Sequence, residues 1–335
     1  MNKYEEIVLR HQLTTRIQQL TNEIANPNLN NTGGANNAVV EEQEEKDIIE
    51  VEFENIIGLQ NIKKELKSFQ NYLKMQKERE RRGFITSSIP LHAVFSGSPG
   101  TGKTTVARIL GKVYKELNIL KKGHVVEVDR CDLVAGYIGQ TTLKTKEVLN
   151  EALDGILFID EAYSLTKGET DERDFGKEAV ETILKFMEDN RSRISIIVAG
   201  YQNNMEKFIN SNPGLKSRFG RIFTFADFTP DELSEIFIIN ADKENYKIRD
   251  HAFEYLIYFI HEFKRLSDPK SFGNGRTIRD IFENLKLIQS DRISEVENIE
   301  EASNTILEYL TLQDIKNLFV KFDIQFPNSA SLAQA

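Results

Sequence analysis

The fold is decided by the stretch Gly97-Ser98-Pro99-Gly100-Thr101-Gly102-Lys103-Thr104, which matches the pattern G-x-x-x-x-G-K-[ST] at every position. An apolar run over 91–95 precedes it, and apolar residues at helical spacing follow over 105–115. A glycine-rich turn between a strand and a helix lets backbone N–H groups surround a phosphate, and the helix N-terminus adds partial positive charge. The stretch therefore predicts a nucleotide phosphate loop.

Particular side chains of this loop have predicted roles. Lys103 would reach the β- and γ-phosphates, Thr104 would hold Mg²⁺, and Thr105 is a further candidate for cofactor binding. The loop therefore predicts a bound phosphate chain together with Mg²⁺. The alternative is a glycine-rich turn that binds nothing, which the complete match and the strand–helix context argue against.

The bulk composition narrows the class of protein. A chain of 335 residues with 40% hydrophobic and 28% charged residues is typical of a globular protein of about two domains. The net charge of −9 argues against a dedicated nucleic-acid binder. No apolar run approaches the roughly 18 residues of a membrane span. The single cysteine, Cys131, excludes an intrachain disulfide, and no signal peptide is evident, so we expect a cytoplasmic protein.

The chain divides into segments of different character. Residues 1–24 predict a short helix, and residues 25–52 are polar and then acidic, which predicts a disordered linker. Apolar strands alternate with helices over 53–227, which predicts a parallel sheet covered on both faces. The strands are expected at 91–95, 124–129, 155–159, 194–199 and 221–225.

The alternation of strands and helices stops after residue 227. Thr229-Pro230-Asp231-Glu232 is typical of a helix start, with a capping box and proline at the first helical position. A smaller helical domain is expected over 228–322, and the tail 323–335 shows no pattern. Its amphipathic segments are expected at 231–245, 250–265 and 275–293, with a last short helix that starts near Thr311.

Two acidic residues follow the third predicted strand. Ile156-Leu157-Phe158-Ile159 leads directly into Asp160 and Glu161, and a buried strand would deliver both carboxylates to the ligand-binding edge of the sheet. Asp160 would hold Mg²⁺ together with Thr104, and Glu161 would orient and polarise the attacking water. Alone, such a pair often only marks a strand end. Its position 57 residues after Lys103 in an α/β pattern favours the catalytic interpretation.

Three arginines are candidates for contacts with phosphate. Arg218, in a Ser-Arg-Phe context before the fifth strand, could reach a neighbouring subunit's γ-phosphate, as arginine fingers do, and Arg221 is the reserve candidate. Arg276 opens a helix of the second domain and could lean onto the phosphates when that domain closes. The alternative for each is an exposed cation without a catalytic role.

The sequence Ala135-Gly136-Tyr137-Ile138-Gly139 lies between the second strand and its helix. Tyr137 and Ile138 between glycines could form a mobile loop that grips an extended chain through apolar contacts. The alternative is a turn whose tyrosine packs against its own domain.

Taken together, these motifs resemble those of the AAA+ ATPases. Over about 53–320 the chain is most similar to the subfamily of red-type Rubisco activase and stage V sporulation protein K, and also to the ATPase module of type VII secretion proteins. The stretches that carry this resemblance are Lys122-Gly123-His124, Asp132-Leu133-Val134, Gly155–Tyr163, Asp174–Ala179, Ala199-Gly200-Tyr201 and Ser211-Asn212-Pro213-Gly214.

The resemblance implies a five-stranded αβα core with a helical lid, which forms a hexameric ring with ATP bound between subunits. It also implies that Tyr137 and Ile138 form a pore loop that pulls a protein client, and that Ile57 and Gly58 lie beside the adenine. The sequence departs from the usual AAA+ pattern at the end of the fourth strand, where a polar residue is common. Here that strand ends in Ala199-Gly200-Tyr201, and Asn203 is only a weak candidate for the polar role.

The leading hypothesis is a ring-forming ATPase that remodels or threads a protein client, which the sequence does not identify. A first alternative is a nucleic-acid motor or loader on the same core, which would favour basic pore residues over Tyr137 and Ile138. A second is a nucleotide-dependent scaffold with little turnover.

Overall fold

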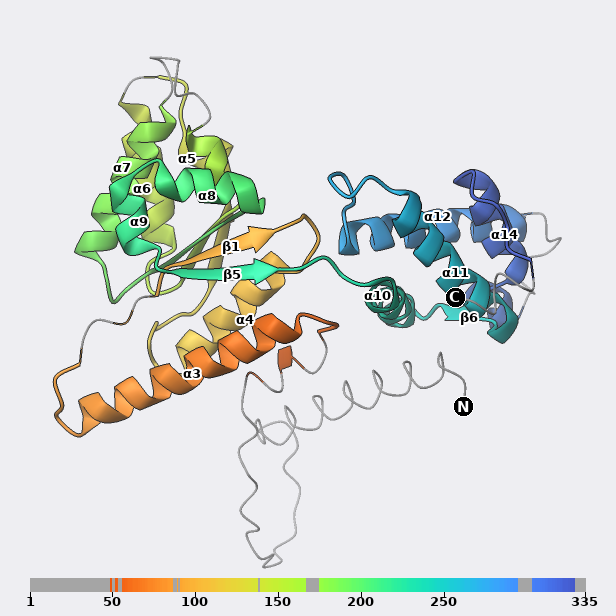
Figure 1. The fold of residues 1–335 in the computed structure, drawn as a ribbon, viewed down its shortest axis with the longest axis horizontal. Helices are drawn as coiled ribbons and strands as arrows, with labels where there is room; N and C mark the ends of the chain where they lie inside the picture. Colours follow the sequence, from red (N-terminus) through yellow and green to blue (C-terminus); the bar gives the residue numbers. More distant parts are fainter. Residues whose placement is uncertain are drawn as a thin grey trace, which may run out of the picture. The chain divides into compact units, whose positions relative to one another are not determined.

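The computed structural model describes residues 49, 52–53, 56–86, 89, 91–137, 139–166, 175–294 and 303–328. They form two compact units (Figure 1). The first is Leu59–Asp227, and the second joins the chain from Phe228 onward to the described residues up to Gly58. The predicted N-terminal helix over 1–24 lies outside the described residues, as does nearly all of the predicted linker.

The segment before Leu59 differs from the expectation in two respects. Ile49, inside the predicted disordered linker, is helical and buried. We also expected the α/β domain to begin at Phe53, but the segment up to Gly58 belongs to the second unit. A Cβ atom at Gly58 would lie 2.4 Å from Oε1 of Glu232, so this close backbone approach ties the segment to that unit.

The first unit contains the predicted five-stranded parallel sheet, which confirms the fold class. Its strand order is β2-β3-β4-β1-β5, and every neighbouring pair is parallel. Two of its three inner strands, β3 and β4, are buried throughout, and nearly all of their residues are apolar. The strands are β1 Ala93–Gly97, β2 Val125–Val128, β3 Ile156–Ile159, β4 Ser195–Gly200 and β5 Arg221–Phe225.

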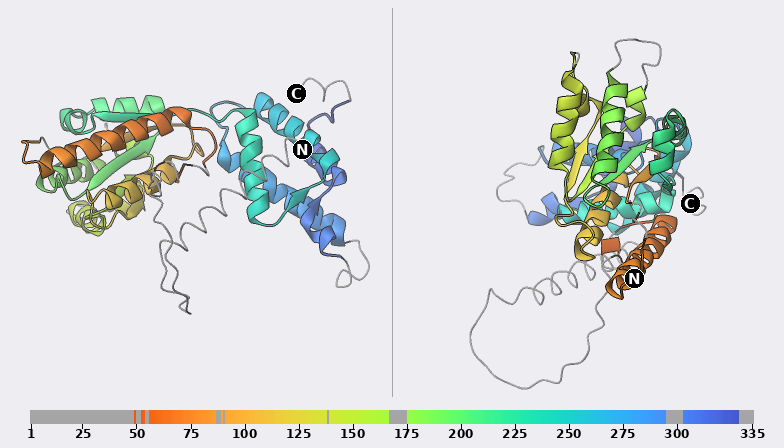
Figure 2. Two further views of the ribbon diagram at one scale, coloured as in Figure 1. Left: turned by 90° about the horizontal axis from the view of Figure 1, so that it is seen from below. Right: turned by 90° about the vertical axis from the view of Figure 1, so that its left-hand side faces the viewer.

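Helices cover both faces of this sheet (Figure 2). The long helix α3 buries the four apolar residues that the sequence placed at 4-3-4 spacing, Ile62, Leu66, Phe69 and Leu73. The short α5, α8, α9 and the 3₁₀ helix η2 were not predicted. The helical elements are α3 Gln60–Arg81, α4 Lys103–Glu116, α5 Arg130–Leu133, α6 Gln140–Glu151, η2 Ala162–Thr166, α7 Gly176–Asp189, α8 Gln202–Asn210 and α9 Pro213–Arg218.

The second unit is helical, as predicted. Thr229 and Glu232 form the expected capping box of α10, with Pro230 as its first residue. Two strands of two residues each, β6 Lys247–Ile248 and β7 Tyr309–Leu310, pair in parallel and were not predicted. The helices are α10 Pro230–Lys243, α11 Asp250–Leu266, α12 Gly275–Ser294, α13 Asn304–Glu308 and α14 Leu312–Lys321.

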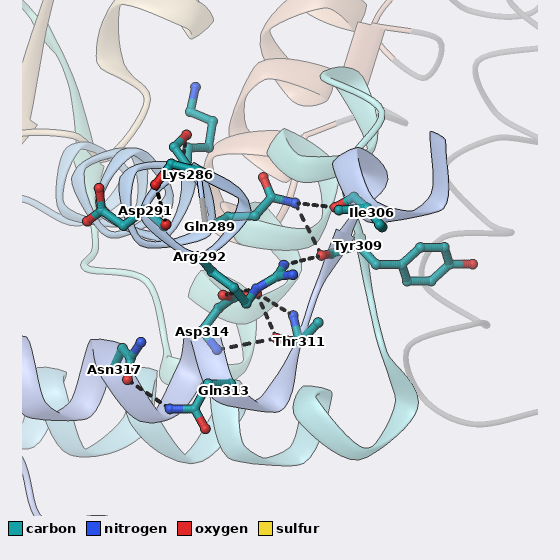
Figure 3. A network of polar contacts seen from close by, with 12 residues as sticks. Lys286, Gln289, Asp291, Arg292, Ile306, Tyr309, Thr311, Gln313, Asp314 and Asn317 are labelled. Atoms are coloured by element: carbon teal, nitrogen blue, oxygen red, sulfur yellow. Dashed lines mark hydrogen bonds and ion pairs between the residues drawn. The ribbon is translucent and has the colours of Figure 1, made fainter. Parts of the chain in front are cut away.

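A buried polar network fixes the C-terminal part of this unit (Figure 3). Asp314 is fully buried and pairs with Arg292 through Nε at 2.7 Å and Nη2 at 3.0 Å. It also accepts a hydrogen bond from the backbone N–H of Thr311 at 2.7 Å. Gln289 donates to the carbonyls of Leu307 and Tyr309. These contacts link α12, β7 and α14.

The chain after Asp323, where the sequence showed no pattern, continues to pack against this unit as far as the structure describes it. The ring of Phe326 stacks on Tyr255 with the centroids 4.8 Å apart, and it meets Phe319 edge to face. Pro327 is buried.

Candidate nucleotide site

The phosphate loop joins the end of β1 to the start of α4, in the predicted strand–loop–helix arrangement. Gly100 and Gly102 have φ values of 72° and 90°, a backbone conformation that favours glycine. A Cβ atom at Gly97 would lie 2.4 Å from the carbonyl oxygen of Phe225 on β5, so only glycine fits there. Thr101 is fully buried and donates its hydroxyl hydrogen to the Ser98 carbonyl at 2.8 Å. The loop is therefore a folded cradle.

Lys103 lies at the centre of this cradle. Its Nζ donates to the carbonyl oxygens of Gly97 at 3.0 Å and Ser98 at 2.7 Å. Lys103 is also the first residue of α4, where the first backbone N–H groups have no intrahelical acceptor. An ammonium, backbone N–H donors and a helix dipole thus converge on one place, and this arrangement fits an anionic phosphate chain. Thr104 is half-buried and Thr105 is exposed on the same turn.

The acidic pair follows β3 as predicted. The four residues of β3 are all buried, and Asp160 and Glu161 come directly after them at the carboxyl edge. Oδ1 of Asp160 accepts the backbone N–H of Glu161 at 3.0 Å, and Glu161 is an exposed residue with a φ of 47°. Strands β1 and β3 end at the same edge with β4 between them, so the phosphate loop and the acids share one edge of the sheet.

The described residues contain no group of three His, Cys, Asp or Glu side chains that could hold a metal ion. The donor set at this edge instead fits Mg²⁺, which prefers oxygen ligands and keeps several waters and phosphate oxygens in its shell. Thr104 and Asp160 are the side chains that would hold it.

Tyr163 follows Glu161 by two residues, and none of the predicted roles was assigned to it. Tyr163, on η2, is only 7% exposed. Burial, followed by the charge of Glu161, raises the pKa of the Tyr163 hydroxyl. The weak candidate Asn203 is exposed.

Crowding at the end of β4 explains why position 200 carries no side chain. A Cβ atom at Gly200 would lie 2.7 Å from Cε1 of Tyr163 and 2.9 Å from the sulfur of Met205. The Tyr163 ring therefore occupies the space that a side chain at position 200 would need. The only signal in the sequence was the unusual Ala-Gly-Tyr ending of the strand.

The two arginines before and within β5 have different surroundings. Nη2 of Arg218, at the end of α9, lies 2.9 Å from Oε2 of Glu188 on α7. The guanidinium of Arg221 lies 3.7 Å from the centroid of the Phe69 ring on α3, in the same unit. Burial lowers the pKa of the Arg221 guanidinium. Packing onto Phe69 accounts for Arg221 without a phosphate contact.

The residues predicted to contact the adenine, to act from the lid and to form the pore loop belong to other parts of the chain. Ile57, Gly58 and Arg276 belong to the second unit, where Arg276 is an exposed residue near the start of α12. Tyr137 belongs to the first unit, between α5 and α6, and 74% of its surface is exposed. Ile138 lies outside the described residues.

Comparison with known proteins identifies the family. Residues 93–227 match the family described as ATPase family associated with various cellular activities (AAA), and residues 229–323 match the AAA lid domain. Stage V sporulation protein K of Bacillus subtilis (strain 168) is 40% identical over 245 residues, which cover 73% of this chain and 76% of that protein. The chloroplastic ribulose bisphosphate carboxylase/oxygenase activase of Cyanidioschyzon merolae is 42% identical over 238 residues, which cover 71% and 80%.

A solved structure agrees on the fold. The FIGL-1 AAA domain in complex with ADP matches with a TM-score of 0.55 over 84% of this chain and 87% of that chain, at 15% identity. The chain is thus an ATPase of the AAA family with its lid domain. More narrowly, it belongs to the subfamily of red-type Rubisco activase and stage V sporulation protein K, which confirms the resemblance seen in the sequence. No helix in the described part of the chain has the length and apolar character to cross a bilayer.

Proposed function

We propose that this ATPase assembles into a hexameric ring in the cytoplasm and couples ATP hydrolysis to the remodelling or threading of a protein client through a central pore. The observation that carries the proposal is the exposed Tyr137. Its side chain is 74% exposed, although a tyrosine in a turn of the same domain could have packed against that domain. Gly136 and Gly139 on either side have open space around them, and Gly139 has a φ of 79°. Such a loop can present an aromatic ring to a passing chain.

The roles at the sheet edge follow from the geometry of the cradle. Lys103 and the loop N–H groups bind and orient the β- and γ-phosphates, and Thr104 and Asp160 hold Mg²⁺. The ion, when bound, neutralises charge that develops on the transferred phosphoryl group. Glu161, exposed at the carboxyl end of β3, orients the attacking water and accepts its proton.

Other groups complete the site from a neighbouring subunit or from the lid. Arg218 acts on the γ-phosphate of a neighbouring subunit, and its ion pair with Glu188 keeps the guanidinium at the surface of α9 until that neighbour is present. Arg276 contacts the phosphates from the lid, and Ile57 with Gly58 lines the adenine. These assignments rest on the resemblance and on the position of each residue at the surface or at a close backbone turn.

The Glu161→Gln variant tests the enzyme and its client together. We expect it to bind ATP, to form a stable ring on size-exclusion chromatography with light scattering, and to release no phosphate. Undiminished turnover would contradict the role of Glu161, and a monomer in saturating ATP would contradict the ring. Proteins retained by the ATP-bound variant, but not by Lys103→Ala, are the candidate clients.

The Tyr137→Ala variant tests the pore. We expect it to keep the basal ATPase rate and to lose the stimulation of that rate by an unfolded polypeptide. Full stimulation would contradict the threading function. Stimulation of the wild type by DNA or RNA but not by polypeptide would favour the nucleic-acid motor, and an absence of steady-state turnover would favour the scaffold.

A further inference from the structure

The segment between Leu133 of α5 and Gln140 of α6 carries Tyr137 and is called the Tyr137 loop here. The side chain of Tyr137 is 74% exposed. A Cβ atom added at Gly136 or Gly139 would meet nothing within 4 Å. Packing therefore contributes little to the position of Tyr137, which depends on how the two ends of the loop are held.

The end of the loop next to α5 is held by two threonines of α6. Thr145 is fully buried and donates its hydroxyl hydrogen to the carbonyl oxygen of Leu133 at 2.9 Å. The hydroxyl oxygen of Thr141, which is also fully buried, accepts the backbone N–H of Ala135 at 3.1 Å. Both bonds lead to the first half of α6, so whatever fixes the start of α6 also fixes the loop.

The other end of the loop enters α6 at a helix N-terminus without a cap of its own. The N-cap residue is Gly139, which has no side chain, and the first turn contains no acidic residue. The backbone N–H groups of a first helical turn have no intrahelical acceptor, and a side-chain oxygen at the N-cap position commonly accepts one of them. In α6 the acceptor comes from another helix.

That acceptor is Glu178 of α7. Its Oε1 atom accepts the backbone N–H of Thr142, the third residue of α6, at 3.2 Å and the Thr142 hydroxyl hydrogen at 2.6 Å. Helices α6 and α7 lie side by side in the first unit (Figure 1). A carboxylate at this place also faces the positive end of the α6 dipole. Glu178 thus provides the hydrogen bonds and the charge of an N-cap, although 36 residues separate it from Thr142 in the sequence.

Helix α7 is a firm support for this contact. Ala179 and Val180, directly after Glu178, are buried, and so are Ile183 and Met187 farther along the helix. These four residues belong to the hydrophobic core that also includes residues of β3 and β4. The carboxylate that caps α6 is therefore carried by a helix anchored in the core of the unit.

We propose that Glu178 is a positioning residue for client binding, which caps α6 from α7 and thereby sets where the Tyr137 loop presents its ring. The proposal rests on the proposed function, in which Tyr137 contacts the client. Glycine at the N-cap permits the backbone turn with a φ of 79° at Gly139, and the carboxylate from α7 supplies the hydrogen bond that glycine lacks.

The first experiment observes the loop directly, without ATP turnover and without a client. The chain contains no tryptophan, so Tyr137→Trp places a single fluorescent reporter in the loop. Adding Glu178→Ala to the full chain should lower the fluorescence anisotropy of this tryptophan, because the start of α6 loses its acceptor. The matched control is Glu181→Ala, an exposed glutamate one turn later on α7, which should leave the anisotropy unchanged.

The second experiment measures client binding in the chain that keeps Tyr137. The probe is reduced and carboxymethylated lactalbumin, which stays unfolded. In Glu178→Ala, the concentration of this polypeptide that half-stimulates ATP hydrolysis should rise roughly 2- to 30-fold, the fold-change equivalent of a lost helix cap. The basal kcat and the KM for ATP should stay at their wild-type values. Glu178→Gln keeps an acceptor oxygen and should stay close to the wild type.

Thr142→Val approaches the same contact from the other helix and provides the test if Glu178→Ala does not fold. It removes the hydroxyl donor, keeps the backbone N–H and the shape of the side chain, and should therefore produce a smaller change in the same direction. The double variant Glu178→Ala/Thr142→Val should be no worse than Glu178→Ala, because both changes act on one contact. Fully additive effects would contradict the capping contact.

The outcomes separate this proposal from the proposed function. If the polypeptide stimulates the wild type and Glu178→Ala changes neither the anisotropy nor the half-stimulating concentration, the positioning role is wrong while the function stands. An equal loss in Glu178→Gln, or an equal fall in basal and stimulated turnover, would indicate a general structural role and would also overturn it. If the anisotropy falls but the polypeptide does not stimulate the wild type, the capping contact stands and the threading function is wrong.

Discussion

Acid is expected to destabilise the first unit through one buried histidine. His92, directly before β1, is 8% exposed, and its Nδ1 accepts the backbone N–H of Ile196 at 3.1 Å. An accepting Nδ1 requires a neutral ring that carries its proton on Nε2. Burial, and then the positive charge of Arg218, lowers the pKa of His92 to about 4. The folded unit therefore resists protonation of this ring.

The sign and size of the effect follow from linkage. The folded pKa lies below the value of about 6.5 for an unfolded chain, so the unfolded chain binds the proton first as the pH falls. The stabilisation is fully present above about pH 6.5 and is lost as the pH falls toward about 4. The total is about 3 kcal/mol, of which about 2 kcal/mol is lost between about pH 7.5 and pH 5.

The assay is urea unfolding, followed by far-ultraviolet circular dichroism, of the wild type and His92→Gln. The glutamine side-chain oxygen can still accept the Ile196 N–H, and the side chain does not titrate. Between about pH 7.5 and pH 5, the wild type should lose about 2 kcal/mol more of its free energy of unfolding than the variant loses. Parallel pH dependences for the two proteins would refute the reasoning.

Three further changes have expected outcomes. Lys103→Ala should abolish ATP binding in isothermal titration calorimetry, because the loop loses its ammonium; retained affinity would contradict the phosphate-loop assignment. Arg221→Leu should lower the free energy of unfolding by about 0.5–2 kcal/mol through the lost contact with Phe69; lost turnover at unchanged stability would instead return Arg221 to the finger role. Arg292→Met leaves an unpaired buried charge on Asp314 and should destabilise the second unit by about 3–5 kcal/mol. Adding Asp314→Ala to the same chain should recover part of this loss. Equal melting temperatures for Arg292→Met and the wild type would argue against a structural role of the pair.

The sequence predicted those parts of the fold that depend on local signals. The three inner strands β1, β3 and β4 contain apolar runs, and the capping box at Thr229 and Glu232 is contained within four residues. The pairing of β6 with β7 brings together segments about sixty residues apart, each only two residues long, and no periodicity can appear in two residues. The packing of Phe326 on Tyr255 depends on tertiary contact in the same way.

The same distinction applies to the site. The phosphate loop and the acidic pair were predicted because each is a contiguous motif whose chemistry requires that spacing. Arg221 was kept as a reserve finger because the sequence does not reveal that its guanidinium lies on Phe69. Exposure of Tyr137 is likewise a property of the folded loop, so the sequence left its two interpretations open.

The unusual end of β4 and the tyrosine after the acidic pair are one feature of the molecule. A side chain at Gly200 and the ring of Tyr163 would compete for the same space, since an added Cβ atom would lie 2.7 Å from the ring. This edge of the sheet can therefore hold a side chain at position 200 or the ring of Tyr163, but not both. Asn203, the weak candidate after the strand, is exposed, whereas the ring that fills the space at Gly200 comes from Tyr163, two residues after Glu161.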